Sequence, residues 1–102
     1  MTHVSKPQCV SQSHPALAGH FPQSPIVPGA WLLTLVESFC RAELGTELTV
    51  TRIQYVRFRA PLLPDQPFRL HIDVLADGVV GFAAERDGSP VAEGRIVVHH
   101  NR

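Results

Sequence analysis

Apolar and polar residues alternate with a period of two through the second half of the chain, from Leu48 to His99. This period is typical of strands that bury one face. The breaks contain proline or glycine, and two of them, Asp77-Gly78 and Asp87-Gly88, are typical of tight hairpin turns. The apolar sets are Val56, Phe58 and Ala60; Phe68, Leu70, Ile72 and Val74; Val80, Phe82 and Ala84; and Ala92, Gly94, Ile96 and Val98. The pattern predicts four antiparallel strands in a meander.

Residues 29–44 follow a helical pattern instead. Pro28 suits the start of a helix and Gly45 is typical of its end. Apolar side chains cover most of the circumference, which leaves a narrow polar stripe of Thr34, Glu37, Ser38 and Arg41. A helix that is apolar on most sides must be covered by other structure. We therefore expect a central helix against one face of the sheet, in an α+β domain.

The first 28 residues contain prolines at positions 7, 15, 22, 25 and 28. This density favours an extended lead-in, in which Val4 to Ser11 could form a strand at the edge of the sheet because of Pro7. The whole chain, 102 residues, is long enough for a single domain spanning residues 1–102. Because so small a domain buries a limited fraction of its surface, we expect a partner subunit to contribute stability.

The composition of the chain argues against several classes of function. Nine basic residues balance nine acidic ones, which argues against a nucleic-acid-binding protein. No apolar run is long enough to span a bilayer, and the N-terminal residues do not resemble a signal peptide, so we expect no membrane partner and a cytoplasmic location. The six histidines and two cysteines are not spaced as metal ligands, so no metal site is predicted, and Cys40 is assigned to helix packing.

Residues 20–29 bring together the groups needed for chemistry next to a carbonyl. Prolines at 22, 25 and 28 stiffen the loop that joins His20 to the expected helix start at Gly29. A helix N-terminus offers free N–H groups and a positive dipole end, which polarise a carbonyl oxygen. A nearby histidine can exchange protons close to neutral pH. On the residues alone, a proline-rich loop with a locally bonded histidine remains the alternative.

The stretch His14-Pro15-Ala16-Leu17-Ala18-Gly19-His20-Phe21-Pro22, continued by Pro25-Ile26-Val27-Pro28-Gly29, closely resembles the signature of FabA/FabZ-type 3-hydroxyacyl-[acyl-carrier-protein] dehydratases. The resemblance resumes at Val56-Arg57-Phe58-Arg59-Ala60-Pro61 and covers most of residues 14–75. It implies a hot-dog fold, in which an antiparallel sheet wraps a long central helix and two chains form a dimer. It also implies that an acyl group on the phosphopantetheine arm of an acyl carrier protein binds at the subunit interface.

The resemblance implies roles for individual residues. His20 would transfer the proton at C2 of the substrate, and the N–H of Gly29 would hold the thioester oxygen. No metal or redox cofactor would be needed. The residues expected around the substrate are Phe21, Val27, Pro28, Gly29, Ala30 and Thr34.

The chain departs from the family pattern at Thr34, which occupies the position where the family has an aspartate or glutamate. A threonine hydroxyl cannot replace a carboxylic acid that protonates a leaving hydroxyl. Glu37 lies one helical turn later, so it is the tentative substitute for the acid; otherwise efficient dehydration has been lost. A structural pair between Glu37 and Arg41 is the alternative role for this carboxylate. Gln23 also replaces a usual glycine, and Asp65-Gln66 lacks the usual glycine of a turn.

Three functions follow from this sequence. The first is dehydration of a 3-hydroxyacyl thioester on an acyl carrier protein, in fatty-acid or polyene-type biosynthesis. The second is an acyl-thioesterase in which Glu37 or Thr34 positions a water molecule. The third is a non-catalytic acyl-carrier binding or scaffolding partner. Arginines on the strands, such as Arg57 and Arg59, could contact a carrier protein or form an ordinary solvent face.

Overall fold

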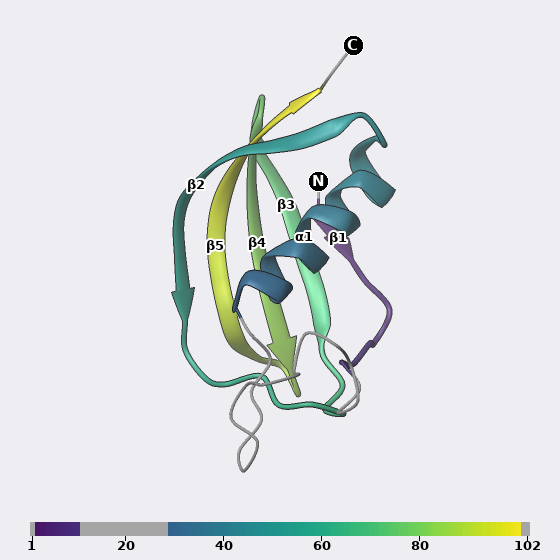
Figure 1. Cartoon of the computed structure of the whole chain (residues 1–102), viewed down its shortest axis with the longest axis vertical. Helices are drawn as coiled ribbons and strands as arrows, with labels where there is room; N and C mark the ends of the chain where they lie inside the picture. The colour runs from purple at the N-terminus through teal and green to yellow at the C-terminus, as the bar shows by residue number, and fades with distance from the viewer. Residues whose placement is uncertain (1, 11–28, 101–102) are drawn as a thin grey trace.

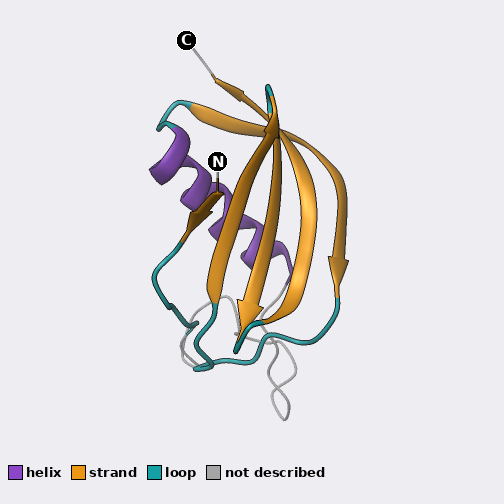
Figure 2. Cartoon of the chain, turned by 180° about the vertical axis from the view of Figure 1, so that it is seen from behind, coloured by secondary structure: helices purple, strands orange, loops and turns teal. Residues whose placement is uncertain are grey.

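A computed structural model describes residues 2–10 and 29–100 of the chain. The described elements are, in order, β1 (Thr2–Val4), α1 (Gly29–Leu44), β2 (Leu48–Phe58), β3 (Arg69–Ala76), β4 (Val79–Arg86) and β5 (Ser89–His100). The strands form a five-stranded antiparallel sheet in the order β1-β3-β4-β5-β2, and α1 lies across one face of it (Figure 1). The opposite face, seen in Figure 2, carries no helix of the described chain. The α+β prediction is confirmed.

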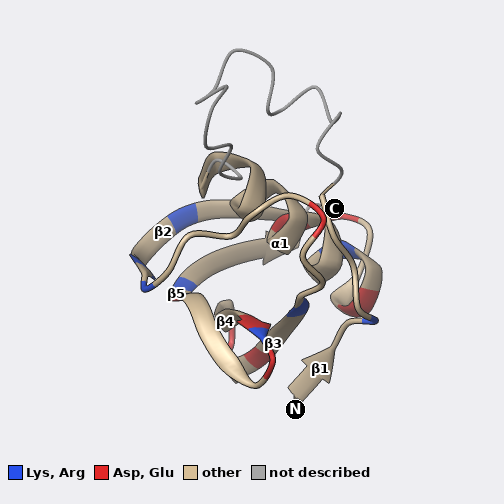
Figure 3. Cartoon of the chain, turned by 90° about the horizontal axis from the view of Figure 1, so that it is seen from below, with Lys and Arg blue, Asp and Glu red and all other residues tan. Residues whose placement is uncertain are grey.

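Helix α1 has the predicted bounds. It begins at Gly29 and ends before Gly45, whose φ of 141° is a conformation that suits glycine. Leu32, Val36 and Cys40 recur every four residues and are buried against the sheet. Half-buried apolar side chains flank this face, and the residues on the opposite side are exposed; they are Ala30, Thr34, Ser38 and Ala42. Figure 3 shows the sheet curving around one side of the helix.

Most of the predicted inward-facing residues form the core, but the prediction is wrong for Val74 and Phe58, which are 38% and 53% exposed near the ends of their strands. Phe68, Leu70 and Ile72 are each at most 2% exposed, and the matching positions of β4 and β5 are buried as well. Both predicted hairpin turns are present, because β3 pairs with β4 and β4 with β5 around Asp77-Gly78 and Asp87-Gly88. In the second turn both residues have positive φ, 52° and 79°, as an Asp-Gly turn allows.

The predicted meander is wrong for one strand. β2 pairs with β5, with Leu48 opposite His100 and Phe58 opposite Ala92, so it lies at the far edge of the sheet from β1. The connection from β2 to β3 contains three prolines, at 61, 64 and 67, and is too long for a tight hairpin. Ten extended residues reach about 33 Å, whereas three strand spacings need only about 14 Å, so this connection passes easily across the end of the sheet.

The lead-in strand is shorter and earlier than expected. β1 covers only Thr2–Val4 and pairs with β3 at the sheet edge, as the edge placement predicted. Beyond it, Gln8 makes an isolated bridge with Phe68, and its backbone N–H donates to the Phe68 carbonyl at 2.9 Å. Pro7 has no N–H to donate, so a continuous ladder through it is not possible.

Gly94 of β5 allows two strands and a core ring to approach closely. A Cβ built at this position would lie 2.5 Å from the carbonyl oxygen of Tyr55 and 2.7 Å from the Phe82 ring. A carbonyl oxygen in a paired strand cannot move aside without disturbing the sheet. The glycine is therefore needed for β2 to pair with β5 at this point.

We expect Gly94→Ala to lower the free energy of unfolding by about 1–3 kcal/mol, because an overpacked site forces backbone and ring to shift. Urea denaturation followed by circular dichroism measures the change. Gly81→Ala is the matched control, because its Cβ would meet the flexible end of Leu75 at 3.2 Å and would lie at an ordinary contact distance, 3.9 Å, from the Asp73 carbonyl oxygen. An equal loss in both variants would contradict a special role for Gly94.

Candidate active site

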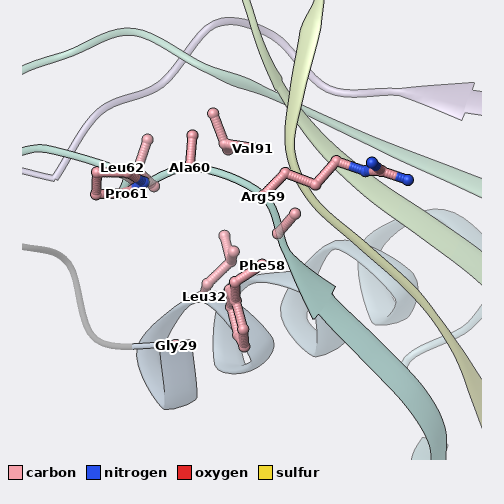
Figure 4. A pocket seen from close by; sticks show the side chains of 9 residues that line it. Gly29, Leu32, Phe58, Arg59, Ala60, Pro61, Leu62 and Val91 are labelled. Carbon is pink, nitrogen blue, oxygen red and sulfur yellow. The ribbon is translucent and has the colours of Figure 1, made fainter.

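A cavity of about 360 Å³ opens at the N-terminal end of α1 (Figure 4). Its volume is at the lower end of the range of about 300–1,000 Å³ that is usual for small-molecule sites. The helix contributes Gly29 and Leu32, the end of β2 and the following segment contribute Phe58, Arg59, Ala60, Pro61 and Leu62, and β5 contributes Val91 and Ala92. Most of these side chains are apolar, which suits an acyl chain better than a charged ligand.

Gly29 is the first residue of α1 and lies at this cavity. The first backbone N–H groups of a helix have no partner within the helix, and they carry the positive end of its dipole. The first turn of α1 contains no acidic side chain that would neutralise this charge. This end of the helix can therefore bind a carbonyl oxygen and stabilise negative charge that develops on it.

The Phe58 ring extends from the end of β2 toward the first turn of α1 (Figure 4). A Cβ built on Gly29 would lie 2.6 Å from Cζ of this ring and 3.1 Å from Cε1. The space that a side chain at position 29 would fill is thus occupied by the tip of Phe58. Phe58 is nevertheless 53% exposed, so only part of the ring is packed.

One arginine, Arg59, lines the cavity, and its charge is paired with a carboxylate. Arg59 donates from Nε to Oε1 of Glu93 at 3.0 Å and forms an ion pair with this carboxylate. Arg86 donates to the carbonyl of Pro61 at 3.4 Å and to the side chain of Gln66, so it helps hold the segment that follows β2. Both ends of the ion pair are partly exposed, so the pair itself contributes little stability.

Thr34 does not line the cavity. Its hydroxyl donates to the carbonyl of Ala30 at 3.1 Å, on the exposed side of the helix. Ala30 and Thr34, which were both predicted to bind substrate, are therefore in contact with each other, and neither lines the cavity beside Gly29. In this chain they face outward, on the side where another subunit could reach them.

Glu37 is engaged in structural contacts. Its Oε1 lies 3.5 Å from a guanidinium nitrogen of Arg41, as the alternative reading of the sequence predicted, and its Oε2 accepts the N–H of Val50 at 3.3 Å. Arg41 in turn donates from Nε to the carbonyl of Leu48 at 2.9 Å. Glu37 is eight residues, or about 12 Å along the axis, from Gly29, and it does not line the cavity.

Four predicted site residues, His20, Phe21, Val27 and Pro28, lie outside the described residues. Among the residues that are described, the structure places Gly29 at the cavity and leaves Ala30, Thr34 and Glu37 outside its lining. The sequence did not point to Phe58 as a site residue. Alternation had assigned it to the inward face of a strand, but the contact with Gly29 depends on how helix and strand meet.

Cys40 has the packing role that the sequence predicted. Its side chain is fully buried, and burial raises the pKa of its thiol from an ordinary value of 9.0 to about 11, with the negative charge of Glu37 as a second cause. A thiol that stays protonated is a poor nucleophile. Within residues 2–10 and 29–100, no three His, Cys, Asp or Glu side chains gather closely enough to hold a metal ion.

The raised pKa of Cys40 predicts a loss of stability at alkaline pH. The unfolded thiol ionises from about pH 9, whereas the folded one stays neutral until about pH 11, so the stabilisation is complete below pH 9 and is lost as pH rises through this interval. Urea denaturation between pH 8 and 11 measures the slope. Cys40→Ala should flatten it, whereas Cys9→Ala, at an exposed position, should leave it unchanged. Equal slopes in both variants would contradict the assignment.

Comparison with known families identifies the chain. The family described as "ApeI-like: ApeI dehydratase" matches residues 3–95. The chain belongs to this dehydratase family. Its FabZ-type resemblance is also confirmed by relatives: it is 33% identical over 98 residues to the 3-hydroxyacyl-[acyl-carrier-protein] dehydratase FabZ of Acetivibrio thermocellus, a match that covers 85% of this chain and 67% of the relative.

The FabZ of Mannheimia succiniciproducens is 32% identical over 100 residues, which cover 86% of this chain and 67% of that protein. For the FabZ of Bartonella quintana the identity is 28%, and the shares are 85% and 64%. The chain thus spans about two thirds of the length of these curated relatives.

Solved structures confirm the hot-dog fold. A chain of "The Dehydratase Heterocomplex ApeI:P from Xenorhabdus doucetiae" superposes with a TM-score of 0.83 at 21% identity, covering 94% of this chain and 93% of that one. An uncharacterised protein from Erwinia carotovora subsp. atroseptica gives a TM-score of 0.78 at 23% identity, covering 98% and 93%. In the described part of the ApeI-like chain, no helix has the length and apolar character required to cross a membrane.

Proposed function

We propose that this ApeI-like chain removes water from a 3-hydroxyacyl thioester carried by an acyl carrier protein. The observation that carries the proposal is the apolar cavity at the N-terminus of α1, where Gly29 lies and the first turn has no acidic side chain, in a chain of a dehydratase family. The apolar walls suit the acyl chain, and the helix end suits the thioester oxygen. We place the chain in the cytoplasm, in fatty-acid or polyene-type biosynthesis.

In this mechanism His20 removes a proton from C2 of the substrate. The electron pair left at C2 is delocalised onto the thioester oxygen, which accepts a hydrogen bond from the N–H of Gly29. The C2–C3 double bond then forms as the C3 hydroxyl leaves, and a proton donor must convert this hydroxyl into water. The products are a 2-enoyl thioester and water, so the reaction needs no redox cofactor.

The proton donor is the missing part. A threonine hydroxyl does not give up its proton near neutral pH, and Thr34 already donates it to the carbonyl of Ala30. Both carboxylate oxygens of Glu37 contact other groups of this chain. We therefore propose that a dimer forms and that the exposed side of α1 faces the site of the other subunit.

The free edge of β2 supports a dimer. β2 is the last strand of the sheet and carries the exposed apolar side chains Ile53 and Tyr55, 46% and 47% exposed. An unpaired, partly apolar edge favours pairing with another chain. In a homodimer both subunits carry Thr34. A hetero-oligomer with a chain that has a carboxylate there would complete the site, and the Xenorhabdus relative is titled a heterocomplex.

The carrier protein would approach the rim of the cavity, which Arg59 lines. Guanidinium groups suit the phosphate of a phosphopantetheine arm and acidic side chains around it. Arg59 is shared with Glu93, so an added anion would bind beside this ion pair. Arg57 is exposed on β2 but does not line the cavity.

We expect His20→Ala to abolish formation of the 2-enoyl thioester, because it removes the base. Thr34→Asp should raise the rate strongly, by a factor of about 10²–10⁴, because it supplies the general acid. Mass spectrometry of a short-chain 3-hydroxyacyl carrier-protein thioester, followed for loss of water, measures both. Glu37→Gln is the matched control on the same helix and should change the rate little.

The same assay separates the alternatives. Full activity in His20→Ala would contradict the assignment of the base. A damaging effect of Glu37→Gln on the rate, with the free energy of unfolding unchanged, would make Glu37 the acid. Release of free thiol from an acyl thioester would identify a thioesterase, and saturable binding of acylated carrier without turnover would identify a non-catalytic binding partner.

Complementation tests whether the acid comes from the other subunit. A chain with both His20→Ala and Thr34→Asp lacks the base and should be inactive alone, whereas the native chain, which lacks the acid, should remove water only at the low basal rate against which Thr34→Asp is measured. Equal mixing with exchange of subunits gives dimers in which one site has both groups, with roughly a quarter of the activity of Thr34→Asp alone. Activity is read by loss of water after mixing, with His20→Ala plus native chain as the control. No gain on mixing would contradict a shared site.

A further inference from the structure

We infer that Phe58 limits the size of the acyl group that binds beside Gly29; the inference rests on the proposed binding of acyl thioesters. Phe58 is the last residue of β2 and lines the cavity together with Gly29 and Leu32. Its ring tip fills the place of the side chain that residue 29 lacks. A group that binds at the start of α1 must therefore lie against this ring or displace it.

The ring is packed on one side only. Phenylalanine has no polar atom, and 53% of Phe58 is exposed, whereas the core rings of Phe68 and Phe82 are 2% and 5% exposed. A half-exposed side chain changes rotamer on the nanosecond scale. The ring is therefore a side wall of the cavity at rest, and it moves only at the expense of its contact with Gly29.

The position of the ring determines which acyl groups gain space when it is removed. Four other apolar wall residues, Leu32, Leu62, Val91 and Ala92, are at most 5% exposed and belong to the core, so they are held in place more firmly than Phe58. Removing the Phe58 ring joins the space over Gly29 to the cavity of about 360 Å³. Short acyl groups that already fit gain little from this space, whereas longer ones gain room.

The test measures binding of saturated acyl pantetheine thioesters of four and ten carbons by calorimetry. These compounds have no hydroxyl to lose, so binding is read without turnover. Phe58→Ala should tighten binding of the ten-carbon thioester about tenfold relative to the four-carbon one, in the range seen when an apolar pocket gains or loses small groups. Phe58→Leu should fall between, and Ile53→Ala, an exposed residue of the same strand outside the cavity lining, should change neither.

A second readout uses stability alone. Gly29→Ala in the native chain places a methyl group against the ring, so it should lower the midpoint of urea denaturation. In Phe58→Ala the same change meets no ring, and alanine is the better helix former, so the midpoint should rise. Opposite signs demonstrate that the two residues share one space. Equal shifts in both backgrounds would overturn the packing on which the inference rests.

The outcomes are distinct. Equal weakening of both thioesters by Phe58→Ala would overturn the size limit and make the ring a general binding wall. Selective tightening without any dehydration of 3-hydroxyacyl thioesters would support the size limit and contradict the dehydratase proposal. No binding of either thioester to any variant would overturn both.

Discussion

Strand β2 is attached to helix α1 at both of its ends, and the rest of the site depends on this constraint. Near one end, Glu37 and Arg41 bond to the backbone of Val50 and Leu48; at the other, Phe58 contacts Gly29. From Gly29 to Glu37 the helix rises about 12 Å, whereas the strand from Val50 to Phe58 covers about 26 Å. The strand must therefore arch away from the helix between the two contacts, as Figure 1 shows.

Two irregularities in pairing supply the bend. The register between β2 and β5 shifts between Val50 and Arg52 and again between Ile53 and Tyr55. An extra residue on one strand bends it and increases its twist. The arch ends with Phe58 directed at the helix N-terminus. The position of this cavity wall therefore follows from the way β2 is attached to α1. It also leaves Ile53 and Tyr55 exposed along the free edge.

Local patterns in the sequence were sufficient for the elements and insufficient for their pairing. Gly45 marks the end of α1, and Asp87-Gly88 marks a hairpin, because each depends on the backbone freedom of one or two residues. The partner of β2 depends on contacts between residues about forty positions apart, such as Val56 and Gly94. No turn motif indicates such a pairing. The sequence therefore predicted a meander, which is wrong for that strand.

The candidate site shows the same division. The N–H of Gly29 was predicted to hold a thioester oxygen, and the structure adds that the ring of Phe58 lies against the same residue. The alternation placed Phe58 on the inward face without indicating which part of the helix it would meet. The pair between Glu37 and Arg41 followed from their i, i+4 spacing, whereas the bond from Val50 to Glu37 required the fold.

The polar stripe of α1 is divided between two tasks, and this division bears on the missing acid. Glu37 and Arg41 bind the start of β2, so their charges are used in holding the chain together. Thr34, one turn earlier, bonds only to its own helix and remains exposed. In the proposed mechanism, a carboxylate that protonates the leaving hydroxyl would be needed at this exposed position, and a threonine there offers only a hydroxyl. The two charged residues of the stripe thus stabilise the fold of one chain, whereas the proposed proton donor would have to come from a group that this helix does not supply.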